Sequence, residues 1–208
     1  MKFHPVLLCF LVSLSVGSVK AANPEQNLAD LMSPAAKISA NFSQKLFDAD
    51  GFEMDSSSGL FSVSGLKLIL WHTTETLEQK VVSNGKVVWI YDPDLAQVII
   101  EPAERILSGS PIALFSGNLS DIQRHYAVAE EYRANTAVFS LVPTSKTSLF
   151  KEITIVFVDG VPDSITLTDT LRQKTKIQFG NVNLNPALDD AAFDFVVPAD
   201  VDVINNVR

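Results

Sequence analysis

Hydrophobic and polar residues alternate most regularly in the C-terminal third of the chain. Apolar side chains recur at every second position of three runs, 153–157, 165–167 and 177–179, with mostly polar residues between them. A period of two is typical of a β-strand with one buried and one hydrated face. The runs therefore predict three half-buried antiparallel strands.

Asp159-Gly160 marks the turn between the first two of these runs. A two-residue loop would place Ile155 opposite Ser164. Because Ile155 and Ile165 both face inward, they should instead lie opposite each other. An odd number of loop residues restores that alignment. We therefore predict a glycine-containing turn with a β-bulge before Pro162.

The stretch Val81–Glu101 carries a strong hairpin signal. Asn84-Gly85 separates two runs rich in β-branched residues, and a type I′ turn favours this dipeptide because both central residues need positive φ. A two-residue loop here predicts pairing of Val82 with Val87. A second reversal at Asp92-Pro93-Asp94 adds a third strand, so the stretch predicts an antiparallel meander.

Shorter strand-like segments flank the meander. Leu66–His72 follows Gly59–Ser64 across Gly65, and its residues Ile69 and Trp71 share one face. Further extended segments are predicted at 137–142, 193–197 and 201–204, with one helical turn at 189–193.

Two segments have a helical pattern instead. Within Pro24–Phe47, apolar residues recur at spacings of three and four, and Ser33-Pro34 predicts a break into two helices because Ser caps helices and Pro is tolerated at their first position. The second segment, Ser110–Tyr126, begins with another Ser-Pro pair, and Asn118 or Ser120 is a candidate cap for its last turn. The apolar stripe of the first segment consists of Leu28, Leu31, Ala35, Ile38, Phe42 and Leu46.

A long antiparallel sheet with few helices curls instead of staying flat. Its apolar face needs a cover, and the two helical segments are the parts of the pattern that can provide one. The sequence therefore predicts a mainly β (α+β) protein. We expect a curved sheet or incomplete antiparallel β-barrel with a helical lid, and an apolar space between them that is either filled or empty.

The N-terminus has the features of a secretory signal peptide. Lys2 precedes an apolar run from Val6 to Val16, and Val19-Lys20-Ala21 fits a cleavage site after Ala21. The run is too short to span about 30 Å of hydrocarbon as a membrane anchor. Cys9 lies too early for a lipidation signal and follows Leu8, where a small residue is needed. We therefore expect a signal peptide over 1–21 and one domain over 22–208, located in the periplasm.

Cleavage would change the composition in two ways that bear on function. The remaining chain would contain no cysteine, and hence no disulfide or thiolate site, because Cys9 is the single cysteine of the sequence. Loss of Lys2 and Lys20, with no acid, would take the net charge from −8 to −10. An acidic surface argues against nucleic acid and anionic membranes as partners.

Candidate catalytic residues are sparse. After residue 21 the chain has two histidines, His72 and His125, and the Ser108-Gly109-Ser110 sequence does not have the spacing of a nucleophile elbow. No clustered histidines or carboxylates have metal-ligand spacing, and the glycines are too scattered for a phosphate loop. We therefore expect no enzyme activity, no metal and no cofactor, with an esterase that uses His72 or His125 as the alternative from another class.

Several dispersed motifs resemble the periplasmic outer-membrane lipoprotein carrier family, LolA. They occur in the expected order and extend over nearly all of the chain after the signal peptide. The segments that carry the resemblance are Phe42-Ser43-Gln44, Val81–Lys86, Val88-Trp89, Tyr91–Leu95, Gln97-Val98, Ser110–Gly117, Ser145–Phe150, Asp169–Thr175, Phe193–Phe195, Pro198 and Asp202–Ile204.

The resemblance implies an incomplete barrel whose helical lid covers a hydrophobic cavity. It implies a monomeric chaperone, without cofactor, that takes acylated lipoproteins from an inner-membrane lipoprotein-releasing ABC transporter and delivers them to an outer-membrane receptor of the same fold. Together with the apolar faces above, it predicts a set of cavity-lining residues. These are Phe42, Leu46, Ile69, Trp71, Ile112, Leu114, Phe115, Ile155, Phe157, Ile177 and Phe179.

One position departs from the family pattern. The family commonly has Lys-Arg-Pro where this chain has Ser64-Gly65-Leu66, so the arginine that ties the sheet to the lid falls on Gly65. The resemblance then implies a looser lid. Two related functions remain as alternatives. The chain could be the lipid-anchored receptor, although its signal peptide lacks a lipobox, or it could carry another acylated amphiphile such as a glycolipid.

Overall fold

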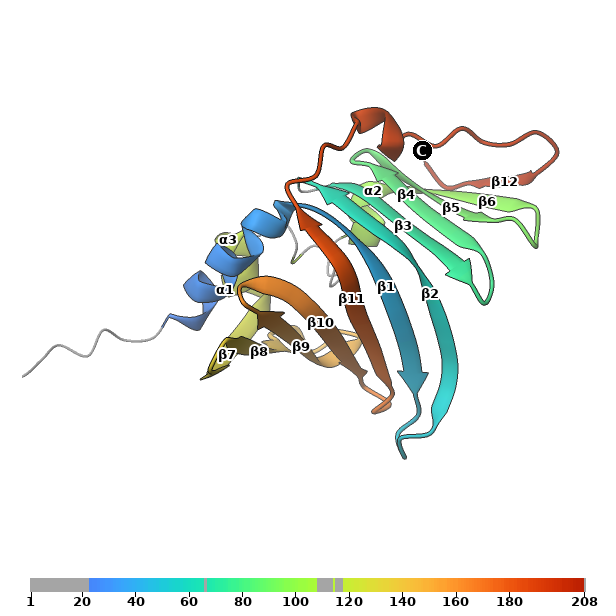
Figure 1. The fold of residues 1–208 in the computed structure, drawn as a ribbon. Helices are drawn as coiled ribbons and strands as arrows, with labels where there is room; N and C mark the ends of the chain where they lie inside the picture. The colour runs from blue at the N-terminus through green and yellow to red at the C-terminus, as the bar shows by residue number, and fades with distance from the viewer. Residues whose placement is uncertain (1–22, 66, 108–113, 115–117, 208) are drawn as a thin grey trace, which may run out of the picture.

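The computed structural model describes residues 23–65, 67–107, 114 and 118–207. The strands of this part of the chain form a single strongly curved sheet (Figure 1). Twelve strands lie in the order β12-β6-β5-β4-β3-β2-β1-β11-β10-β9-β8-β7. Neighbours are antiparallel except β12, which runs parallel to β6. The strands β7 and β12 form the two edges, so the sheet is open and the prediction of an incomplete barrel is confirmed. The strands are β1 (Lys37–Phe47), β2 (Glu53–Ser64), β3 (Leu68–Glu75), β4 (Gln79–Asn84), β5 (Val87–Asp92), β6 (Gln97–Pro102), β7 (Tyr126–Arg133), β8 (Thr136–Pro143), β9 (Phe150–Val158), β10 (Val161–Asp169), β11 (Lys174–Leu184) and β12 (Asp202–Asn205).

The helical elements are short. Side chains of Asn23 and Asn118 cap the first turns of α1 and α3, which confirms one of the two predicted caps for the second helical segment. The helices α1 and α3 lie together on the concave side of the β7–β10 region (Figure 1). The predicted Ser110-Pro111 helix start lies outside the described residues. The elements are α1 (Pro24–Met32), the 3₁₀ turn η1 (Pro34–Ala36), α2 (Ala103–Leu107), α3 (Leu119–His125) and the 3₁₀ turn η3 (Asp190–Phe193).

The prediction of a second helix after Ser33-Pro34 is wrong. The chain makes only the 3₁₀ turn η1 and then continues as β1, the strand between β2 and β11. The residues Ile38, Phe42 and Leu46 are four apart, which is close to one helical turn but also two periods of a strand. Pairing on both sides of β1 satisfies its backbone hydrogen-bonding groups, and this tertiary effect overrides the local pattern.

The meander forms as predicted, but its register differs by two residues. Ser83 pairs with Val88 and Val82 with Trp89, so Val82 does not pair with Val87. The side chain of Asn84 accepts hydrogen bonds from the backbone N–H groups of Lys86 and Val87, and Gly85 takes the positive φ of +87°. Because a shift of two preserves the alternation, every side chain remains on its predicted face.

The alignment of Ile155 with Ile165 is confirmed, although by a different route. Val158 pairs with Val161, so Asp159-Gly160 is a two-residue turn, and both residues have positive φ. The register then shifts between Pro162 and Ser164, which places the bulge after Pro162 and not before it.

The C-terminal segment packs on the other face of the sheet. Phe193, at the end of η3, is fully buried, and the ring of Phe195 contacts those of Trp89 and Tyr91. The predicted helical turn at 189–193 is thus confirmed. Within the described part of the chain, none of the helices has the length and apolar character needed to cross a bilayer.

Candidate apolar binding face

The register of the sheet gathers most of the predicted cavity residues on its concave face. Phe42 pairs with Phe179, Ile155 with Ile165, and Ile165 with Ile177, so alternate positions of these strands point the same way. These side chains belong to one contiguous apolar cluster. Its members from the predicted set are Phe42, Ile69, Trp71, Leu114, Ile155, Phe157, Ile177 and Phe179.

Aromatic rings form the centre of this face. The ring of Trp71 lies 4.0 Å from that of Phe42 and 5.4 Å from that of Phe61, measured between ring centroids. Phe61 in turn stacks on Phe179 at 5.7 Å. Aromatic side chains provide large apolar surfaces with little conformational freedom, so this cluster is a firm wall for an apolar ligand.

Three predicted residues stand apart. Leu46 lies on the same face near the end of β1, where it is half-buried outside the cluster. Ile112 and Phe115 lie outside the described residues. Prediction also missed several members that the period-two pattern of their strands could have identified, including Ile38, Phe61, Val63, Phe139, Leu141 and Ile153.

The helices cover part of the concave face. Leu28 and Met32 of α1 and Ile122 of α3 are buried in the same cluster as the strand residues. Helix α1 also contacts the edge strand β7 through polar groups. The side-chain amide nitrogen of Asn27 donates to both carboxylate oxygens of Glu130, at 3.0 and 2.9 Å.

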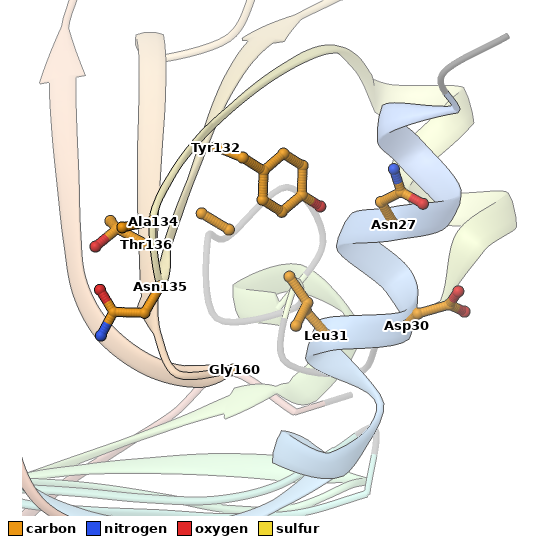
Figure 2. A pocket seen from close by; sticks show the side chains of 9 residues that line it. Asn27, Asp30, Leu31, Tyr132, Ala134, Asn135, Thr136 and Gly160 are labelled. Carbon is orange, nitrogen blue, oxygen red and sulfur yellow. The ribbon is translucent and has the colours of Figure 1, made fainter. Parts of the chain in front are cut away.

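A groove of about 490 Å³ opens beside this contact, between α1 and the β7–β8 hairpin (Figure 2). Leu31 and Tyr132 project into it from the helix and the strand. Small residues at 134, 137 and 160 and the polar residues Asn27, Asp30, Asn135 and Thr136 complete its lining. Burial, together with the neighbouring charge of Glu130 and a hydrogen bond to it, raises the pKa of Tyr132 above its ordinary value. The volume is within the range of small-ligand pockets.

Gly65 forms the turn between β2 and β3 with φ of +65°. Its backbone N–H donates a 2.6 Å hydrogen bond to the carbonyl of Ala36 at the end of η1. A Cβ atom added at this position would meet no atom within 4 Å, but any residue other than glycine would adopt a strained backbone there. The backbone of Gly65 itself therefore ties the sheet to the segment that follows α1.

One of the two candidate histidines, His72, lies beside a carboxylate. His72 belongs to the opposite face of β3 from Trp71, and its Nε2 atom lies 2.9 Å from the carboxylate of Glu78. No group of three His, Cys, Asp or Glu residues in the described ranges is arranged to hold a metal ion.

Comparison with known proteins identifies relatives along nearly the whole chain. The family model described as "Outer membrane lipoprotein carrier protein LolA" matches residues 33–196. The outer-membrane lipoprotein carrier protein of Azotobacter vinelandii is 37% identical over 205 residues, which cover 98% of this chain and 99% of that protein. The protein of the same name from Pseudomonas aeruginosa (strain UCBPP-PA14) is 35% identical over 199 residues, with 94% and 96% covered.

Solved structures add the fold alone. The crystal structure of an uncharacterized conserved protein from Thermus thermophilus superposes with a TM-score of 0.56 at 14% identity. The superposition covers 87% of this chain and 98% of that one. The open curved sheet is therefore shared with a protein of very different sequence.

Proposed function

Because the chain belongs to the LolA family of outer-membrane lipoprotein carrier proteins, we propose that it is a lipoprotein carrier that holds the acyl chains of its cargo against the concave face of its sheet. The observation that carries the proposal is the continuous apolar cluster on that face, with Trp71 and Phe42 at its centre. The binding residues would be the eight predicted members of the cluster and Leu46, together with Ile112 and Phe115, which lie outside the described residues.

The energetic need for such a carrier follows from the chemistry of the cargo. Each methylene of an acyl chain gains about 0.8 kcal/mol when it leaves water, so a lipoprotein with several chains does not cross an aqueous space unaided. A curved sheet with an apolar inner face and a helical cover can bury those methylenes. Transfer of this kind needs only reversible burial, and we expect no chemical turnover.

The route of the cargo completes the proposal. The signal peptide over 1–21 would place the mature chain, 22–208, in the periplasm as a single carrier domain. There it would receive lipoproteins from the inner-membrane lipoprotein-releasing ABC transporter and pass them, as a monomer, to an outer-membrane receptor. N-terminal sequencing of periplasmic material should find Ala22 first, and an intact Met1 would contradict this part.

The two tryptophans of the chain allow a direct test of the binding face. Trp71 lies in the concave cluster, whereas Trp89 contacts Phe195 on the other face. Trp89→Phe therefore leaves a single reporter on the proposed site, and Trp71→Phe leaves a matched reporter away from it. A synthetic triacylated lipopeptide should shift the emission of Trp71 at about equimolar ratio and leave that of Trp89 unchanged.

The opposite result is equally clear. If neither single-tryptophan protein responds, and an environment-sensitive apolar dye also fails to bind, the concave face is a packed core and the proposal is wrong. If only Trp89 responds, the ligand binds the outer face and the named residues are not the site.

A further inference from the structure

The C-terminal end of helix α1 is fixed by the chain that follows it. Its C-terminal end leads through Ser33 and η1 directly into β1, and the hydrogen bond from Gly65 to Ala36 fastens that junction. Asn27 lies in the first half of the helix, where its side chain bonds to Glu130 of the edge strand β7. Release of this contact would remove a polar restraint on the first half of the helix and leave it held by apolar packing such as that of Leu28.

The wall of the groove beside this contact packs against the buried face. The side chain of Tyr132 is 55% exposed in the groove, and its ring packs edge-on against Phe139 at 6.3 Å. Phe139 is fully buried and packs against Phe157 at 5.9 Å. Ala137, another wall of the groove, is paired with Phe157 across β8 and β9. Packed apolar side chains therefore extend from the wall of the groove to the concave cluster.

We propose that the groove between α1 and the β7–β8 hairpin is the portal by which an acyl chain reaches the concave face, and that the Asn27–Glu130 contact is the latch that keeps it closed. This inference rests on the proposed carrier function, because it assigns the entry route to the same binding face. It commits to one occupant, a saturated acyl chain. The apolar part of the lining, from Leu31, the Tyr132 ring and Ala137, favours it.

The latch has a suitable strength. Both oxygens of a partly buried carboxylate accept from one amide group, and a hydrogen bond to a charged partner is among the stronger ones in proteins. Loss of such a bond changes an equilibrium about tenfold or more. The contact is thus strong enough to hold the helix down and weak enough for the burial of a few methylenes to replace it.

Variants of Asn27 test the latch. Asn27→Ala removes the donor, and Asn27→Asp places a second carboxylate opposite Glu130. Both should speed the uptake of an environment-sensitive apolar dye about tenfold and raise amide exchange in α1. Gln26→Ala is the matched control, because the side chain of Gln26 bonds to Asp30 within the same helix, and it should leave the uptake rate unchanged. Glu130→Gln keeps one acceptor and should have an intermediate effect.

A plug variant tests the portal. Leu31→Trp puts a larger ring into the groove and should slow the uptake of dye and of palmitate about tenfold while the final amount bound stays the same. Because Leu31 is partly buried, circular dichroism must first show a native spectrum. Thr136→Trp, from the opposite wall, provides an independent plug with the same expected result.

The outcomes separate this inference from the carrier function. If dye binds normally but Asn27→Ala and Asn27→Asp take it up no faster than Gln26→Ala, the latch is wrong and the carrier function stands. If both plug variants take up dye at the normal rate, chains enter elsewhere and the portal is wrong. If no variant binds dye or palmitate at all, the carrier function fails and the portal fails with it.

Discussion

The side-chain amide of Asn206 donates a 2.7 Å hydrogen bond to Oε1 of Glu101, and this contact fastens the end of the chain to the sheet. Arg105 of α2 donates to the same oxygen at 2.6 Å. Glu101 is only 4% exposed, and its Oε2 atom is buried without a hydrogen-bond partner among the described residues. A buried carboxylate oxygen with no partner is costly, so this contact positions the tail at the expense of global stability.

Replacement of Glu101 by leucine should therefore separate two effects. The free energy of unfolding should stay the same or rise by about 1 kcal/mol, because the buried charge is lost and Arg105, which is 64% exposed, can hydrate. Amide exchange in β12 should nevertheless become faster, since Asn206 has lost its acceptor. Glu104→Ala, which removes an acid from α2, should change neither quantity. A large loss of stability in Glu101→Leu would contradict this account.

Phe157 should be a major contributor to stability. Its side chain is fully buried, so Phe157→Ala should lower the free energy of unfolding by about 3–5 kcal/mol, as measured by urea titration. Phe52→Ala is the control, because that side chain is 71% exposed and should contribute little. Equal effects of the two substitutions would show that the burial of Phe157 contributes little to stability.

Stability should fall at alkaline pH. Burial raises the pKa of Tyr126 above 10.0, and burial with Glu130 raises that of Tyr132. A raised tyrosine pKa favours the neutral form in the folded protein. The associated stability is present below about pH 10 and is lost as pH rises through the folded-state pKa. Urea titrations across this range should show the decline, and Tyr126→Phe should reduce it; an identical decline in Tyr126→Phe would exclude Tyr126 as its source.

Any substitution of Gly65 should lower stability through the backbone alone. This loss must be subtracted before an effect of the side chain on the lid is judged. With φ of +65°, both Gly65→Ala and Gly65→Arg should lose about 1 kcal/mol of stability. The difference between them isolates the guanidinium group. If the missing family arginine makes the lid looser, Gly65→Arg should slow amide exchange in α1 relative to Gly65→Ala. Equal exchange in the two variants would indicate that the hydrogen bonds of Gly65 and Asn27 already replace the arginine.

Local sequence patterns were sufficient for the C-terminal hairpin. Alternation of period two identified the inward residues of β9, β10 and β11. Because cross-strand partners share one face, it also identified the pairing of Ile155 with Ile165. The exact bulge position was wrong because a sequence shows that one residue is extra, but not which one the backbone excludes from the ladder.

The segment that became β1 shows where local information is ambiguous. A spacing of four between Ile38, Phe42 and Leu46 suits one face of a helix and one face of a strand equally well. Pairing with β2 and β11 decided between helix and strand. Phe179 of β11 lies far along the chain from its partner Phe42. A sequence pattern read over a few residues cannot detect pairing partners that lie so far away in the chain.

The sequence by itself thus determined the fold class, the face to which most strand residues belong, and the family. Only the tertiary structure decided the polar contacts that hold the helix and the tail. Asn27 and Glu130 are 103 residues apart, and Glu101 and Asn206 are 105 apart. Hydrophobic periodicity arises from burial and repeats along a strand, whereas a single hydrogen bond between distant segments has no period. It exists only once the sheet has curved and brought its two partners together.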